Sequence, residues 1–162
     1  MTPEDRLEEL KLVLPPAPKP AGVYRPLMIV GSAAYVSGHG PLLPDGTMLT
    51  GRVGADLDQQ GGYRAARQVG LAMLATLRAG LGSLNRVRRI VRTLGMVNST
   101  PEFVNHPAVL NGFSELMAEV FGPDQGVGAR SAVGMAALPA NIAVEVEAQF
   151  EIETEGGRAG SV

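Results

Sequence analysis

The feature that most constrains the fold is a strict alternation of apolar and polar residues near the C-terminus. From residue 144 to 153, five apolar side chains alternate with four glutamates and one glutamine. A period of two is the geometry of a β-strand, in which successive side chains point to opposite faces. The alternation therefore predicts a strand with one buried face and one polar face.

A second predicted strand precedes this one and carries an arginine. The stretch from residue 129 to 148 places Arg130 and Glu145 on neighbouring strands, joined by a short turn that contains Pro139. A guanidinium grips a carboxylate through two parallel hydrogen bonds, and a glutamate orients or deprotonates water. The pair predicts a site that holds a small carboxylate beside a water molecule. Spacing alone favours a simpler interpretation, a glutamate on a solvated strand face and an arginine paired with some nearby acid.

Composition sets the size of the fold and argues against a nucleic-acid partner. The chain has 162 residues, of which 45% are hydrophobic and 19% are charged, as expected for one globular domain. Its formal net charge of −2 gives no basic footprint for nucleic acid. The basic run Arg86, Arg88, Arg89 and Arg92 is interpreted as surface charge, because side chains of a strand alternate between its faces. No nucleic-acid partner is expected.

The residue types that the chain lacks narrow its chemistry. It contains no cysteine, which excludes disulfides, thiolate zinc sites and a cysteine nucleophile. Its two histidines, His39 and His106, stand far apart and lack the spacing of a zinc-dependent base deaminase. Neither a metal nor another cofactor is expected. Without a signal-like segment or an apolar run that could span a bilayer, the chain is expected to be cytoplasmic and to have no membrane partner.

Local patterns divide the chain into three parts. Thr2 and Pro3, with Asp5 in the first turn, indicate the start of a short helix. The proline-rich segment 15–22 is expected to run as an extended strap, because proline disrupts a helix. The predicted organisation is an accessory segment over residues 1–20, one domain over 21–153 and a flexible tail over 154–162.

The predicted order of elements is βββαβαββ. Apolar residues spaced by three and four predict helices at 58–80 and 107–121. Turn signals at Gly31-Ser32 and Asp45-Gly46 separate the first strands. The six strands are expected at residues 24–30, 33–37, near 48, 87–97, 131–136 and 143–152.

This order predicts a two-layer α+β fold with a mixed six-stranded sheet and both helices on one face. Two helices cover only one face of such a sheet, so the other face is left bare in an isolated chain. Strand residues such as Leu94, Met96, Val133 and Met135 indicate burial on both faces. We therefore predict a homo-oligomer, in which a partner subunit covers the bare face.

Four segments resemble one known family. They are Val23-Tyr24, VSGHGP at 36–41, VRTLGMVN at 91–98 and the block that runs from ARS through Leu138-Pro139 to VEVEA. Over roughly residues 20–152 the chain thus resembles the Rid family, also called YjgF-like or endoribonuclease L-PSP. The resemblance implies a chorismate-mutase-like fold, assembled as a homotrimer with clefts between subunits. It also implies hydrolytic deamination of reactive 2-imino and enamino acids to 2-oxo acids and ammonia.

The resemblance also implies roles for particular residues. Arg130 matches the family's carboxylate-binding arginine, and Glu145 matches the glutamate that positions the attacking water. The backbone at position 132 is expected to touch the ligand, where many relatives carry cysteine and this chain carries alanine. The implied substrate-binding positions are Tyr24, Ser37, Gly38, Asn111 and Ala132. Tyr24, Ser37 and Gly38 match positions that line the cleft from the adjacent subunit, and Asn111 matches a helix asparagine only approximately.

Two departures from the family pattern bear on activity. The segment before Arg130 is about two residues longer than usual, and GHG at 38–40 replaces the more common Gly-Gln-Ile-Pro. His39 could add a proton donor, although a lone histidine in a turn is more often structural. His106 is interpreted as a capping or surface residue.

Three functions fit the resemblance unequally. A trimeric module that binds small carboxylates without turnover is the main alternative to the deaminase. Retention of Glu145 favours the enzyme, because a second carboxylate would only repel a bound anion. A ribonuclease or translation inhibitor is less favoured, since the chain offers no paired histidines, basic cleft or stacking aromatics.

Overall fold

The alternating segment forms strand β5 (Val144–Ile152), the middle strand of a five-stranded sheet in the computed structural model, which describes residues 1–154. Its apolar side chains are buried beneath helices, with Val146 at 0% and Phe150 at 1% exposure. Glu147 and Gln149 lie exposed on the opposite face. The period of two was therefore a reliable guide to this strand.

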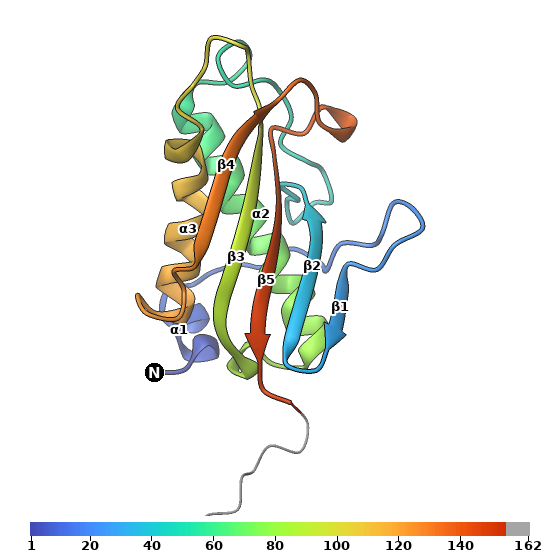
Figure 1. Cartoon of the computed structure of the whole chain (residues 1–162), viewed down its shortest axis with the longest axis vertical. Coiled ribbons are helices and arrows are strands. Elements are labelled where there is room, and N and C mark those ends of the chain that lie inside the picture. The colour runs from blue at the N-terminus through green and yellow to red at the C-terminus, as the bar shows by residue number, and fades with distance from the viewer. Residues whose placement is uncertain (155–162) are drawn as a thin grey trace, which may run out of the picture.

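The sheet has the strand order β1-β2-β5-β3-β4 (Figure 1). The other strands are β1 (Leu27–Val30), β2 (Ala33–His39), β3 (Val87–Asn98) and β4 (Ala129–Met135). Strand β3 pairs in parallel with β4 and antiparallel with β5, and the remaining pairs are antiparallel. A parallel pair needs a long crossover, which the helix between β3 and β4 supplies.

This strand order corrects the prediction that Arg130 and Glu145 lie on neighbouring strands. Strand β3 lies between β4 and β5 and pairs with both. The short turn around Pro139 therefore joins two strands that are not hydrogen-bonded to each other. Sequence proximity suggested a hairpin here, but the crossover from β3 places β4 on the outer side of β3.

Two long helices, α2 (Gln59–Leu81) and α3 (His106–Phe121), cover one face of the sheet (Figure 1). Asp58 caps α2 by accepting a hydrogen bond from the backbone N–H of Gly61 at 2.6 Å, and Gly82 ends it with a φ of 82°. The core lies between these helices and the sheet. Its fully buried side chains include Met73, Leu74, Phe113, Leu116, Val144 and Val146.

A third helix, α1 (Pro3–Glu9), packs against the end of this layer. Thr2 and Asp5 form the predicted capping box. Leu7 is 5% exposed, and Arg6 donates a hydrogen bond to the carbonyl of Glu119 in α3 at 3.1 Å. The strap after α1 has no regular secondary structure over residues 15–20. The predicted tail falls almost wholly outside the described residues.

The prediction of six strands was wrong, because the region near Met48 forms only isolated bridges. One joins Leu42 to Met48 and another joins Thr50 to Ile142. Pro41 and Pro44 remove backbone donors from this stretch, so a continuous ladder cannot form. For the same reason β1 begins at Leu27, directly after Pro26, rather than at Tyr24.

Within residues 1–154, no helix lies on the second face of the sheet, as predicted (Figure 1). Apolar side chains on it remain accessible, including Met28, Tyr35, Val133 and Met135, which are 36 to 49% exposed. Charged side chains such as Arg92 and Glu147 lie between them. We call this surface the open face. Accessible apolar side chains gathered on one face, rimmed by polar groups, are typical of a surface that binds another protein.

Candidate functional site

Arg130 extends from β4 on the helix side of the sheet, where it is anchored to α3. Its Nη1 donates to Asn111 Oδ1 at 3.0 Å and to Ser114 Oγ at 3.1 Å, and its Nη2 donates to the carbonyl of Pro107 at 3.4 Å. In the register of the sheet Arg130 lies beside Thr93, a residue that the helices bury. A guanidinium has five N–H donors, so these three bonds leave two for a ligand.

The charge of this guanidinium is not balanced by a nearby acid. Within residues 1–154, Arg130 forms no ion pair with an aspartate or glutamate. The groups that hold it are all neutral acceptors: an amide, a hydroxyl and a backbone carbonyl. An exposed, oriented guanidinium with two free donors is suited to a carboxylate.

A cavity of about 270 Å³ opens beside Arg130, between α3, β3 and the loop before β4. Its lining residues are Ile90, Thr93, Asn111, Phe113, Ser114, Met117, Gly126, Val127, Gly128 and Arg130. Gly126, Val127 and Gly128 belong to the segment that is longer than usual before Arg130. The departure noted in the sequence therefore shapes the wall next to the arginine.

Glu145 lies on the open face, on the side of the sheet opposite to Arg130. It pairs in register with Met96 on β3, whereas Arg130 pairs with Thr93, and an odd number of residues along a strand separates opposite faces. Burial raises the pKa of the half-buried Glu145 carboxyl above its ordinary value, and the neighbouring charge of Glu147 adds to the shift. A raised pKa suits a carboxyl that takes up a proton during a reaction.

Gly38 on β2 is the residue over which the Glu145 carboxylate lies. A Cβ at position 38 would collide with Glu145 Oε1. Glycine is thus required at this position by close approach and not by an unusual backbone angle, since its φ is not in the left-handed range. The predicted cleft residue Gly38 and the predicted base Glu145 are in direct contact within one chain.

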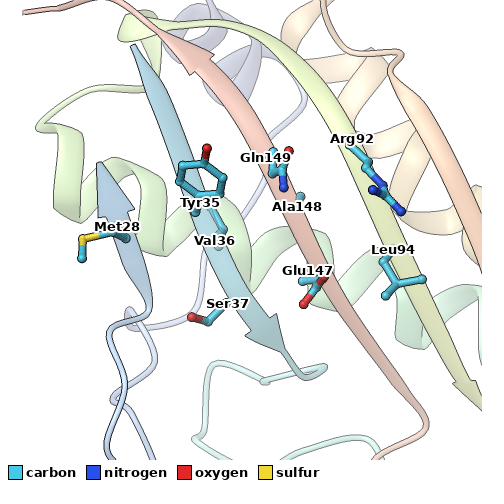
Figure 2. Close-up of a pocket in the computed structure, with 9 residues that line it drawn as sticks. All are labelled: Met28, Tyr35, Val36, Ser37, Arg92, Leu94, Glu147, Ala148 and Gln149. Carbon is cyan, nitrogen blue, oxygen red and sulfur yellow. The ribbon is translucent and has the colours of Figure 1, made fainter. Parts of the chain in front are cut away.

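Ser37 belongs to the same face as Glu145. Its hydroxyl donates to the carbonyl of Arg25 at 2.6 Å, and it lines a hollow of about 290 Å³ over the open face. Figure 2 shows Tyr35, Glu147 and Arg92 standing on this surface from β2, β5 and β3. The polar groups of this hollow therefore come from three strands.

The other three predicted contacts, Tyr24, Ala132 and Asn111, do not line the hollow over the open face. Tyr24 precedes β1, is 48% exposed, and its hydroxyl accepts a hydrogen bond from the backbone N–H of Ala21 at 3.2 Å. Ala132 packs against the core on the helix side, two residues along β4 from Arg130. Asn111 is the oxygen acceptor that holds Arg130.

Two partners of Arg130, Ser114 and Pro107, were not predicted. The spacing of Asn111 and Ser114 contains a usable signal, because residues three apart share one face of a helix. Two short polar side chains on the face of α3 toward β4 are an obvious anchor for an arginine there. The Pro107 carbonyl has no such signature.

Neither histidine donates a hydrogen bond to the Glu145 carboxylate. His39 is buried at the end of β2, with one ring nitrogen at the carbonyl of Ser37 and the other at the hydroxyl of Thr76. His106 begins α3, and its Nε2 lies 3.1 Å from Ser99 Oγ. Across residues 1–154, no three His, Cys, Asp or Glu side chains are grouped so that they could hold a metal ion. None of the helices in that range is long and apolar enough to cross a membrane.

The predicted site residues therefore form two groups on opposite faces of the sheet. Arg130, Asn111 and Ala132 lie on the helix side, at the edge strand β4. Ser37, Gly38 and Glu145 lie on the open face. A carboxylate bound at Arg130 cannot meet Glu145 of the same chain, because the sheet separates them.

Comparison with known proteins gives consistent matches over nearly the whole chain. A family model described as YjgF/chorismate mutase-like, putative endoribonuclease matches residues 4–149. Protein TCP17 of Trypanosoma cruzi is 41% identical over 146 residues, which cover 90% of this chain and 91% of that protein. A protein of unknown function from Agrobacterium tumefaciens has a similar crystal structure, with a TM-score of 0.85, 42% identity and coverage of 94% of this chain and 93% of that one. A putative endoribonuclease from Shewanella oneidensis gives a TM-score of 0.89 at 35% identity, over 94% and 100% of the two chains.

Proposed function

We propose that this chain, which belongs to the YjgF/chorismate mutase-like, putative endoribonuclease family, deaminates reactive 2-imino acids and their enamine tautomers by hydrolysis. The products are 2-oxo acids and ammonia. The observation that carries the proposal is an anchored Arg130, which forms no ion pair within residues 1–154, together with a half-buried Glu145 whose pKa is raised. These are a carboxylate grip and a proton acceptor, the two groups that this hydrolysis needs.

Arg130 binds the carboxylate of the substrate through its two free donors. The anchor from α3 fixes the plane of the guanidinium before binding, so little conformational entropy is lost. This grip places the imine carbon at a defined distance from the base. Correct placement of two reacting groups is worth several orders of magnitude in rate.

Glu145 accepts a proton from water as the water oxygen attacks the protonated imine carbon. A bond from oxygen to carbon forms, and the electron pair of the C=N bond moves to nitrogen, which gives a tetrahedral aminohydrin. Glu145 then returns the proton to nitrogen, the C–N bond breaks, and ammonia leaves as the carbonyl forms. The Glu145 carboxylate takes up the hydroxyl proton in this step and passes it to the departing ammonia, which leaves as ammonium. A protonated imine is already electrophilic, so one base and good positioning suffice.

The complete site lies at a cleft between subunits, with Arg130 from one chain and Glu145 from the next. This arrangement is supported by the separation of the two groups on opposite faces of the sheet and by the uncovered open face. The sequence resemblance implied that Tyr24, Ser37 and Gly38 line the cleft from the adjacent subunit. The contact of Glu145 with Gly38 favours a site in which Ser37, Gly38 and Glu145 come together from the adjacent subunit. We propose a homotrimer of three such clefts.

Complementation between two inactive variants tests both the chemistry and the arrangement. Imines are generated in situ by an amino-acid oxidase, and release of 2-oxo acid is measured with and without the protein. Arg130→Ala and Glu145→Ala are each expected to lose the acceleration. After unfolding and refolding as an equal mixture, about one quarter of the interfaces would hold both native residues, so about one quarter of the wild-type rate should return.

Each other outcome identifies a different error. If neither variant loses activity, the assigned residues are wrong. If both lose activity and the mixture recovers none, although wild type recovers after the same treatment, the two residues do not meet across an interface. If wild type accelerates no imine but binds pyruvate in a way that Arg130→Ala abolishes, the chain is the carboxylate-binding module. Cleavage of RNA by wild type alone would support the ribonuclease.

A further inference from the structure

The pairing of β2 with β5 is interrupted where the predicted base lies. The register shifts between Val36 and His39, which indicates a β-bulge in β2. Ser37 and Gly38 form this bulge, and the Glu145 carboxylate lies directly over Gly38. The position of the base therefore depends on two residues that the β2–β5 ladder does not hold. On the β1 side, the backbone N–H of Ser37 donates to the carbonyl of Pro26 at 3.0 Å.

His39 supplies hydrogen bonds at this point. The residue is 4% exposed, and its ring lies between the bulge and helix α2. Nδ1 is 2.6 Å from the carbonyl oxygen of Ser37, and Nε2 is 2.7 Å from Thr76 Oγ1. A carbonyl only accepts, so Nδ1 carries the proton and Nε2 accepts from the Thr76 hydroxyl. Both nitrogens of a neutral ring are satisfied, and neither is available to a ligand.

We propose that His39 is a positioning residue whose neutral ring ties the Ser37–Gly38 bulge to α2 and so fixes the Glu145 carboxylate over Gly38. The inference rests on the proposed function, in which Glu145 is the base. It assigns His39 to the support of Glu145 rather than to proton donation in the cleft. It also gives a role to the GHG segment, the second departure from the family pattern.

The surroundings of His39 keep its ring neutral. Burial lowers the pKa of His39, and the hydrogen bond to the Ser37 carbonyl opposes this shift only in part. Neither cause is a charged group. A neutral imidazole that donates at one end and accepts at the other forms a fixed bridge, because only one tautomer satisfies both partners.

Three variants test the bridge. His39→Leu fills the space without hydrogen bonds, His39→Gln keeps one donor and one acceptor, and Thr76→Val removes only the partner in α2. We expect His39→Leu to lower kcat by about ten- to a hundredfold with KM nearly unchanged, since a displaced base slows the reaction but leaves Arg130 to bind the carboxylate. His39→Gln should keep most of the wild-type kcat, and Thr76→Val should fall between them.

A second measurement does not depend on turnover. The titration of the Glu145 carboxyl, followed by NMR of the labelled side chain, should move toward the ordinary range for glutamate in His39→Leu, because the carboxyl loses its buried position. His39→Gln should leave it unchanged. His106→Leu, which alters the other histidine, serves as the matched control and should also leave it unchanged. Thermal unfolding of each variant shows whether the fold is intact.

The outcomes separate this inference from the proposed function. An unchanged kcat and an unchanged Glu145 titration in a folded His39→Leu variant would overturn the inference. So would an equal loss in His39→Gln, since the hydrogen bonds would then be irrelevant. If wild type hydrolyses no imine, the deaminase fails, but the Glu145 titration still decides whether His39 positions that carboxylate. If His39→Leu does not fold, Thr76→Val decides by the same two readouts.

Discussion

Single residues on this sheet owe their properties to close neighbours. Arg130 is oriented by three acceptors from α3 before any ligand binds, and Glu145 is partly desolvated above a glycine. Asn111 was predicted to touch the ligand. In the structure it accepts a hydrogen bond from Arg130, which gives it an anchoring role, and it lines the cavity beside that arginine. At this scale, the neighbouring groups determine which hydrogen-bonding atoms of a side chain remain free for a ligand.

Gly38→Ala should separate steric support of the base from folding. The added methyl group would push the Glu145 carboxylate away from its position, so kcat should fall by about tenfold or more. Thermal unfolding should change little, because Glu145 can move outward toward solvent. Gly22→Ala is a matched control, since its Cβ would meet only the Tyr24 ring at an ordinary 3.7 Å. Equal activity in both variants would contradict the role of Gly38.

The pH dependence of activity should follow the raised pKa of Glu145. The carboxylate must be ionised to accept a proton, so kcat/KM should fall as the pH drops through a value above the ordinary glutamate range. Burial is the main cause of the shift and Glu147 the second. Glu147→Gln should therefore move the acidic limb of the profile to lower pH. A limb that stays in place would show that Glu147 does not act on the base in the assembled protein.

At the scale of elements, the period of the hydrophobic residues correctly predicted the strands and helices that local sequence determines. The alternation at β5 and the three-and-four spacing of α2 and α3 gave those elements to within about two residues, because each buries one face against the same core. The family resemblance and the two-layer mixed fold are likewise confirmed. Two predictions were wrong. Prolines prevent the strand that was expected near Met48, and the assumption that β4 and β5 are neighbours concerned long-range strand order. Strand order depends on crossovers, which no local pattern encodes.

The sequence selects candidate site residues one by one, but it does not give their arrangement. Arg130 and Glu145 stand out by residue type and by resemblance. Whether Arg130 and Glu145 share a face of the sheet depends on two registers, that of β4 against β3 and that of β5 against β3. His39 contacts both Ser37 and Thr76, and Thr76 lies 37 residues further along the chain. The sequence alone therefore left the role of this histidine undecided.

Helix α1 should contribute to the stability of the domain, although the sequence suggested an accessory segment. Leu7 is nearly fully buried against the core. Leu7→Ala should lower the free energy of unfolding by about 2 to 3 kcal/mol, from lost burial and the cavity left behind. Urea denaturation measures this change, and Leu10→Ala at the exposed end of the helix is the control. A loss below about 0.5 kcal/mol would mean that α1 is dispensable.

At the scale of the whole molecule, the open face is the surface through which copies should associate. It combines accessible apolar side chains with charges, and the helices lie on the other side. Val133→Asp places a charge at 40% exposure on this face, whereas Val104→Asp does so at 78% exposure in a loop. Only the first variant should dissociate the oligomer in size-exclusion chromatography with light scattering, because burying an unpaired charge is costly. It should also abolish imine hydrolysis without unfolding the chain.

If both variants behave like wild type, or if wild type is itself a monomer at micromolar concentration, the open face is not the interface. Dissociation by Val104→Asp alone would move the interface to the loop region. Loss of activity in Val133→Asp without dissociation would place that residue in the site.

The insertion of β3 between β4 and β5 has a consequence for how the protein would behave in dilute solution. Under the proposed mechanism, a chain that carries Arg130 and Glu145 on opposite sides of the sheet would be inert by itself, however well it is folded. Specific activity should then fall as total protein is diluted below the dissociation constant of the oligomer, while an enzyme whose site lies within a single chain would keep its specific activity. A newly made chain would stay silent until it meets others like itself, so the concentration of the protein becomes a control on its own rate.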